Sequence, residues 1–392
     1  MVTIMTSLWL EQLRAEDRVS VKPHASPVLH ALEYLLGQLD ASYLTTLREF
    51  GGLQSYPSRL KDPVPADYST GSVGIGATAP IWGAIARRYV NTRLGAGGTG
   101  RQWSLVGDAE LDEGAVWEAV LDPMVAELGE IVWVVDFNRQ SLDRVVPTMG
   151  STRLQGMFTA AGWQVLTVKY GRLLEELFAR PGGAALRDRI DAMANPEHQQ
   201  LLRRRPAEIR ATLPGDGPGA GDISALIRDV DVSALLAAVR NLGGHDLAAL
   251  REAYGQIDDT RPTVVIAYTL KGYGLAIEGH PQNHSALLTQ AQLKQLAGDL
   301  GVDPAPWQTF DPGSPPAELL RAAAERLRRA VHRAEPAPDV PPDLGRTPHG
   351  TATKTTRSRL SAARRWSASS TGIRTRWRSS PASAAWRPPT WA

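Results

Sequence analysis

Two polar side chains, Asp108 and Asn138, stand at positions where they could together bind Mg²⁺. Each follows an apolar stretch that predicts a β-strand, Gln102–Val106 before the first and Ile131–Phe137 before the second. Carboxylate and amide oxygens are hard donors, and Mg²⁺ takes few ligands from protein and the others from phosphate and water. A helix predicted to begin at about Glu113 would direct its N-terminal N–H groups to the same place, which favours a phosphate.

The two predicted strands and a helix from about Glu113 to Leu128 make up a βαβ unit, whose crossover is expected to be right-handed. Both turns then lie at the carboxyl edge of a parallel sheet, where open α/β folds bind their ligands. A glycine–aspartate pair with a distant asparagine is also typical of a helix cap and a simple turn. From spacing alone, that second interpretation of Asp108 and Asn138 stays open.

Further periodic segments extend the α/β pattern. Helical spacing is found from Pro27 to Phe50, from Pro80 to Val90 and over 223–255, and strands are predicted at 163–170 and 263–269. We therefore predict an α/β fold, a three-layer parallel sheet flanked by helices.

The run Gly107-Asp-Ala-Glu-Leu-Asp-Glu113, with Asn138-Arg-Gln-Ser-Leu-Asp143 after it, resembles the thiamine-diphosphate fingerprint of the transketolase superfamily. Within that superfamily it is most similar to the homodimeric type of pyruvate dehydrogenase decarboxylating component. Two positions depart from the family pattern: Ala109 replaces a glycine and Ser58 replaces a histidine. Co-linear segments carry the similarity over about 20–300: His24-Ala-Ser-Pro27, Gly51–Pro57, Ser72–Gly76, Asn241–Asp246, Thr269–Gly274, and Glu278-Gly279 followed by His284.

The resemblance implies a transketolase-type thiamine-diphosphate-binding fold and a set of site residues. Mg²⁺ would be bound by Asp108, the Asn138 side chain and the main-chain carbonyl of Gln140. Candidate cofactor contacts also include Gly107, Ala109, Glu110, Ser26 and Lys271, and the candidate catalytic residues are His24, His245 and His284. The plainer alternatives are a loop histidine at 24 or 284, a turn residue at 245 and a packed lysine stem at 271.

The implied function is the thiamine-diphosphate- and Mg²⁺-dependent oxidative decarboxylation of pyruvate, a small 2-oxo acid. The implied partners are a second copy of the chain, as a homodimer, and the acyltransferase component of a dehydrogenase complex if the enzyme is intact. We expect a truncated chain without the second catalytic domain of the family. The alternatives are a transketolase acting on sugar phosphates and a non-catalytic remnant that only binds the cofactor; the segments 241–246 and 271–274 favour the pyruvate branch.

Composition narrows the remaining function classes. The chain has no cysteine, which excludes disulfides, thiolate metal sites and a cysteine nucleophile and suits a cytoplasmic protein. It shows neither a signal peptide nor an apolar run long enough to span a membrane. The formal net charge is +2, but residues 346–392 hold nine Arg and one Lys without any acid, which leaves 33 basic and 41 acidic residues in 1–345. We therefore expect no nucleic-acid binding by the body of the protein.

Composition also suggests three parts. We predict a thiamine-diphosphate domain over 1–334, a Pro-rich linker over 335–355 and a basic tail over 356–392. The tail has four Trp, one Leu, one Ile and no Val, so no apolar face can be drawn on it. It is either disordered or translated out of frame.

Overall fold

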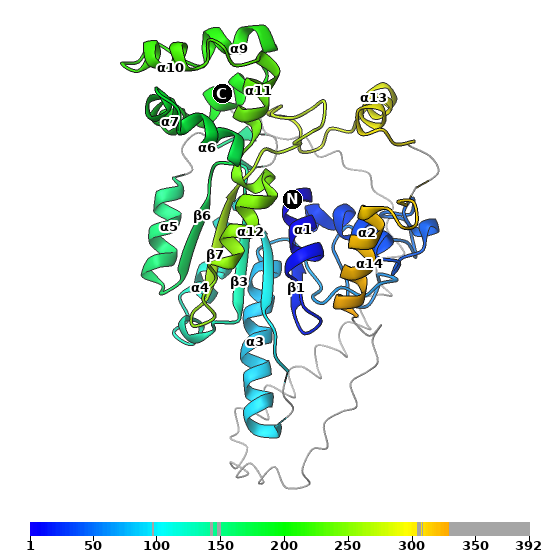
Figure 1. Ribbon diagram of the computed structural model, residues 1–392. Helices are drawn as coiled ribbons and strands as arrows, with labels where there is room; N and C mark the ends of the chain where they lie inside the picture. Colours follow the sequence, from blue (N-terminus) through cyan, green and yellow to red (C-terminus); the bar gives the residue numbers. More distant parts are fainter. Residues whose placement is uncertain (96–97, 142–143, 147–149, 304–306, 308, 329–392) are drawn as a thin grey trace, which may run out of the picture. The chain divides into compact units, whose positions relative to one another are not determined.

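A five-stranded parallel sheet organises the chain in the order β1-β2-β3-β7-β6 (Figure 1). All four strands expected from the sequence are present, with ends shifted by a residue or two. The additional strand, β1, is only four residues long and half polar, too short for a periodic signal to show. The strands are β1 (Arg18–Val21), β2 (Gln102–Gly107), β3 (Ile131–Phe137), β6 (Gln164–Val168) and β7 (Thr263–Tyr268).

Both faces of the sheet are covered by helices. Along β3, Trp133 and Val135 enter a core shared with the helices 75–94, 114–120 and 151–160. Val132 and Val134 enter a second core shared with the helices 2–7, 26–35 and 247–255. Successive side chains of a strand point to opposite faces, so a strand that is apolar throughout must be buried on both. The predicted three-layer α/β fold is confirmed.

The computed structural model describes residues 1–328 apart from 96–97, 142–143, 147–149, 304–306 and 308. The predicted linker 335–355 and basic tail 356–392 lie outside these described residues. Every element named here belongs to one compact unit, Met1–Pro336.

Helices connect the strands of the main sheet, and several follow one another over 172–255, between β6 and β7. A short antiparallel hairpin, β4 (Gln140–Ser141) with β5 (Arg144–Val145), follows β3 directly. The α-helices are α1 (Val2–Ser7), α2 (Ser26–Leu35), α3 (Ile75–Leu94), α4 (Gly114–Val120), α5 (Ser151–Ala160), α6 (Arg172–Phe178), α7 (Gly183–Ala192), α8 (Asn195–Leu202), α9 (Pro206–Thr212), α10 (Ala220–Leu226), α11 (Val232–Arg240), α12 (Leu247–Gly255), α13 (Gln290–Leu300) and α14 (Pro315–Leu327).

Two predicted helices are shorter than their apolar spacing indicated. The helix expected over Pro27–Phe50 ends at Leu35, because Gly37 takes a left-handed conformation with φ of 73° and turns the chain away. The helix expected over Glu113–Leu128 is an α-helix only to Val120, since Pro123 cannot continue it. The spacing of apolar residues indicates which positions are buried, but it does not indicate where a glycine or a proline ends the helix.

The third predicted helix is longer than expected. α3 begins at Ile75 rather than at about Pro80, after Gly74, which adopts a φ of 75°. A Cβ at Gly74 would lie 2.5 Å from Val116, so glycine also permits the close approach of α4 to this end of α3. Within the described residues, none of the helices has both the length and the apolar character that crossing a membrane requires.

The sheet core yields a stability prediction. Trp133 is fully buried, with its ring 5.1 Å from that of Trp163 and 6.0 Å from that of Phe158, centroid to centroid. Replacing Trp133 by alanine should lower the free energy of unfolding by about 3–5 kcal/mol in urea denaturation. The control, Trp82→Ala, removes a ring that is 48% exposed and should cost under about 1 kcal/mol. Equal losses for the two variants would contradict this account of the core.

Candidate functional site

The turns that follow β2 and β3 meet at the carboxyl edge of the sheet. Gly107 is paired with Asp136 in the parallel register, so Asp108 and Asn138 come just beyond neighbouring strand ends. The carboxylate Oδ2 of Asp108 accepts a hydrogen bond of 2.5 Å from the main-chain N–H of Arg139. The two turns predicted to share a site are therefore in direct contact.

The Asp108 carboxyl group is only 2% exposed. Burial raises its pKa to about 7, against the hydrogen bond from the Arg139 N–H and the charge of Lys22, which both lower it. A carboxylate held away from water in this way is stabilised by any cation that can approach it. The position therefore favours a metal ion more than a solvent-exposed helix cap would.

The turn from Asn138 to Gln140 folds tightly around this carboxyl group. Arg139 has a φ of 62°, a left-handed conformation that costs a non-glycine residue about 1 kcal/mol. Asn138 Oδ1 accepts a hydrogen bond of 3.0 Å from the Gln140 N–H, and both side chains are buried. Among the described residues, the Gln140 Oε1 atom is buried without a hydrogen-bond partner. Oxygen atoms are thus concentrated in this turn.

The turn after β2 contains a short 3-10 helix, Asp108–Asp112, and α4 then begins at Gly114, within one residue of the start expected at Glu113. Glu110 Oε2 accepts a 2.7 Å hydrogen bond from the Gly107 N–H, so in this structure the Glu110 side chain caps the turn. Ala109 is not among the described residues with positive φ, so its backbone does not require the conformational freedom of a glycine.

A buried ion pair lies beside this turn and was not anticipated from the sequence. Lys22 Nζ contacts Asp136 Oδ2 at 2.9 Å, and Thr269 Oγ1 donates to Asp136 Oδ1 at 2.6 Å. Burial opposes both charges, but their mutual attraction raises the pKa of Lys22 and lowers that of Asp136. A Cβ at Gly107 would lie 3.0 Å from Lys22 Nζ, which places this ammonium against the start of the Asp108 turn. The sequence does contain one signal for this ion pair. Asp136 is the single acid in the apolar run of β3, and a charge buried there needs a partner.

Two of the candidate catalytic histidines meet. The rings of His24 and His284 lie edge to face with centroids 5.0 Å apart, and Lys271 Nζ contacts His284 Nδ1 at 3.0 Å. Burial, followed by the nearby charges of Lys22, His284 and Lys271, lowers the pKa of His24. The neutral ring is thereby favoured at His24, which suits proton transfer near neutral pH.

His245 occupies a different environment. Its Nε2 accepts a 2.7 Å hydrogen bond from the Leu270 N–H, and its ring stacks on Tyr273 with centroids 3.7 Å apart. Burial lowers its pKa to about 3, so the ring stays neutral. Through this hydrogen bond, His245 holds the loop after β7 next to Lys271. Ser26 is buried as the first residue of α2, two positions after His24.

The donor set around Asp108 is not a cluster of acids. Among the described residues, no group of three or more His, Cys, Asp or Glu side chains has a geometry that could hold a metal ion. The predicted ligand set has one carboxylate, one amide and one main-chain oxygen. Such a set suits Mg²⁺ that is also bound by phosphate oxygens and water.

The sequence is similar to that of known proteins. Residues 10–181 match the family described as transketolase, thiamine diphosphate binding domain. The pyruvate dehydrogenase E1 component of Corynebacterium glutamicum is 30% identical over 306 residues, and that of Escherichia coli K12 is 26% identical over 339 residues. These alignments cover 73% and 82% of this chain, but 32% and 38% of the relatives.

Solved structures show the same fold. The transketolase of Leishmania mexicana superposes with a TM-score of 0.57 at 17% identity, over 83% of this chain and 40% of that one. The transketolase of Campylobacter jejuni gives a TM-score of 0.54 at 19% identity, over 82% and 39%.

Residues 10–181 therefore match the thiamine diphosphate binding domain of the transketolase family. The two sequence relatives named above are pyruvate dehydrogenase E1 components. The chain spans about a third of the length of these curated relatives.

The raised pKa of Asp108 yields a pH prediction. Burial raises the pKa of this carboxyl group from its ordinary value of 3.8 to about 7. Between these pH values the carboxyl group ionises more readily in the unfolded chain than in the folded protein, so the free energy of unfolding of wild type falls as pH rises. Relative to wild type, Asp108→Asn should therefore become more stable as pH rises from about 4 to 8, by up to about 4 kcal/mol. Urea denaturation without metal at several pH values measures this difference. The control is Asp299→Asn, an exposed carboxyl on α13. If the difference in free energy of unfolding between Asp108→Asn and wild type does not change with pH, Asp108 is not a buried carboxyl group with a raised pKa.

Proposed function

We propose that this domain binds the diphosphate of thiamine diphosphate through Mg²⁺ held by Asp108, Asn138 and Gln140. The observation that carries this proposal is the contact between the turns after β2 and β3, which places a buried carboxyl group of raised pKa beside buried amide oxygens. A divalent cation would offset the charge that burial penalises at Asp108. Membership of a thiamine diphosphate binding family supports the same ligand.

When bound, thiamine diphosphate supplies a carbon nucleophile and an electron sink. The residues of this chain would position it and handle protons. Asp108, Asn138 and the Gln140 carbonyl would fix the metal at the sheet edge. The His24–His284 pair, with Lys271 on the second ring, would hold or move protons near the reacting centre. His245 would support the loop that carries Lys271.

The reaction that best fits is the oxidative decarboxylation of pyruvate. The two named sequence relatives are pyruvate dehydrogenase E1 components, while the two transketolases resemble the chain at the level of fold. In this proposal the substrate is a small 2-oxo acid, and the acyl group passes to an acyltransferase partner. A homodimer is part of the same proposal. Residues 1–328 supply the metal- and diphosphate-binding half of the site.

Calorimetric titration tests cofactor binding. The full chain should bind thiamine diphosphate only with Mg²⁺ present, and Asp108→Ala or Asn138→Ala should weaken binding by about tenfold or more, as loss of a metal-positioning group does. Asp299→Ala removes an exposed carboxyl from α13 and should leave affinity unchanged. Metal-independent binding, or binding that survives Asp108→Ala, would overturn the assignment of this site.

Release of CO₂ from carboxyl-labelled pyruvate tests the reaction. The full chain should release label only with thiamine diphosphate and Mg²⁺, and His24→Ala should lower the rate by about a hundredfold without loss of cofactor binding. Cofactor binding without any release of label would restrict the function of this chain to binding.

A further inference from the structure

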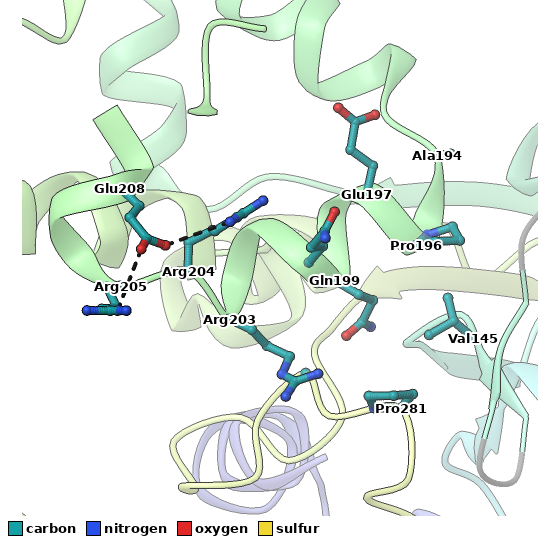
Figure 2. Close-up of a pocket in the computed structure, with 12 residues that line it drawn as sticks. Val145, Ala194, Pro196, Glu197, Gln199, Arg203, Arg204, Arg205, Glu208 and Pro281 are labelled. Carbon is teal, nitrogen blue, oxygen red and sulfur yellow. Dashed lines mark ion pairs between the residues drawn. The ribbon is translucent and has the colours of Figure 1, made fainter. Parts of the chain in front are cut away.

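A cavity lies next to the turn Asn138–Gln140. It has a volume of about 930 Å³ and is lined by α8, by the start of α9, by the loop after β7 and by β5 (Figure 2). Val145 of β5 is paired with Gln140, and Pro281 follows His280, whose carbonyl accepts from Gln140 Nε2 at 3.5 Å. The cavity therefore shares its wall with the metal-binding turn, but none of the candidate cofactor or catalytic residues lines it.

One wall of the cavity carries a buried amide without a partner. Gln199 on α8 is only 5% exposed, and among the described residues neither its Nε2 nor its Oε1 forms a hydrogen bond. A buried amide normally has both a donor and an acceptor partner, because leaving either group unpaired is costly. A ligand that carries both an acceptor and a donor would satisfy this side chain.

Positive charge predominates around the cavity, whose lining includes Arg203, Arg204 and Arg205 but only Glu197 and Glu208 as acids. Arg204 and Arg205 both contact Glu208, at 3.8 and 3.6 Å, as the dashed lines in Figure 2 mark. Glu197, on the opposite side, is paired with Arg189. The remaining lining cation is Arg203.

Within the described part of the chain, Arg203 forms no ion pair. In Figure 2 it extends away from Glu208, toward the loop that carries Pro281. Its Cγ would lie 3.8 Å from a Cβ placed on Gly279 of the same loop, and a Cβ there would also lie 3.2 Å from Gln199 Oε1. Residues four apart on a helix share one face, so Arg203 and Gln199 are directed toward the same side of α8.

We propose that this cavity binds a small organic anion with a hydroxyl group next to its charged group. Arg203 pairs with the phosphate or carboxylate of the ligand, and the planar guanidinium suits either anion because both present two oxygens to it. Gln199 donates to and accepts from the adjacent hydroxyl. The ligand is a phosphorylated or carboxylated hydroxy compound, and this site is separate from the cofactor site.

Titration calorimetry of the full chain, without thiamine diphosphate or Mg²⁺, tests the proposal independently of the cofactor. The probes are glycerol 3-phosphate, lactate and inorganic phosphate. Glycerol 3-phosphate or lactate should bind, and whichever binds more tightly identifies the anion. Arg203→Ala should weaken this binding by about tenfold or more.

The matched control is Arg205→Ala, which removes the same charge from the same wall but from a residue paired with Glu208 and 86% exposed in its side chain. It should change affinity by less than about twofold. Gln199→Leu should weaken the binding of glycerol 3-phosphate or lactate more than the binding of inorganic phosphate. Its melting temperature should not fall, because the amide that it removes has no described partner in the protein.

Three results would overturn the proposal. The first is no binding of glycerol 3-phosphate or lactate by wild type. The second is equal weakening by Arg203→Ala and Arg205→Ala, which would indicate attraction by net charge alone. The third is unchanged binding of the hydroxylated probes in Gln199→Leu.

Discussion

The hydrogen bond from the Arg139 N–H to the Asp108 carboxylate is the contact on which the candidate site depends. It joins the turns after two neighbouring parallel strands, and it exists because β2 and β3 are in a register that aligns Gly107 with Asp136. To make it, Arg139 adopts a left-handed conformation that only a minority of non-glycine residues take up. Strain of this kind is kept where the surrounding structure enforces it, and here the two buried strands do so.

Burial of charge is the second constraint, and it explains the features that surround this contact. The sheet edge contains the carboxyl groups of Asp108 and Asp136 away from water, yet their environments differ. Asp136 is compensated inside the protein by Lys22 and Thr269, so its pKa falls. Asp108 has mainly main-chain N–H partners, so burial dominates and its pKa rises. The two neighbouring acids therefore differ. The charge of Asp136 is neutralised within the protein, whereas Asp108 suits an external cation.

The cofactor turn is also tied to the helical region beyond β3. The Arg139 guanidinium reaches Asn195 Oδ1 at 3.4 Å, at the beginning of α8, and the hairpin after Gln140 forms part of the wall of the cavity. The β4–β5 hairpin and Arg139 thus lie between the proposed metal site and the cavity wall that carries Gln199 and Arg203.

The sequence by itself determined the parallel α/β class, the strands β2, β3, β6 and β7 and the common sheet edge of the turns that carry Asp108 and Asn138. These follow from local apolar runs and from the rule that parallel strands end at one edge. Helix ends at Leu35 and Val120 were missed because glycine and proline stops act through backbone geometry that apolar spacing does not report. The Lys22–Asp136 pair, the contact of His24 with His284 and the unpaired Gln199 were decided only in the tertiary structure. Each depends on whether residues distant in sequence provide a partner or a wall, and no local pattern encodes that.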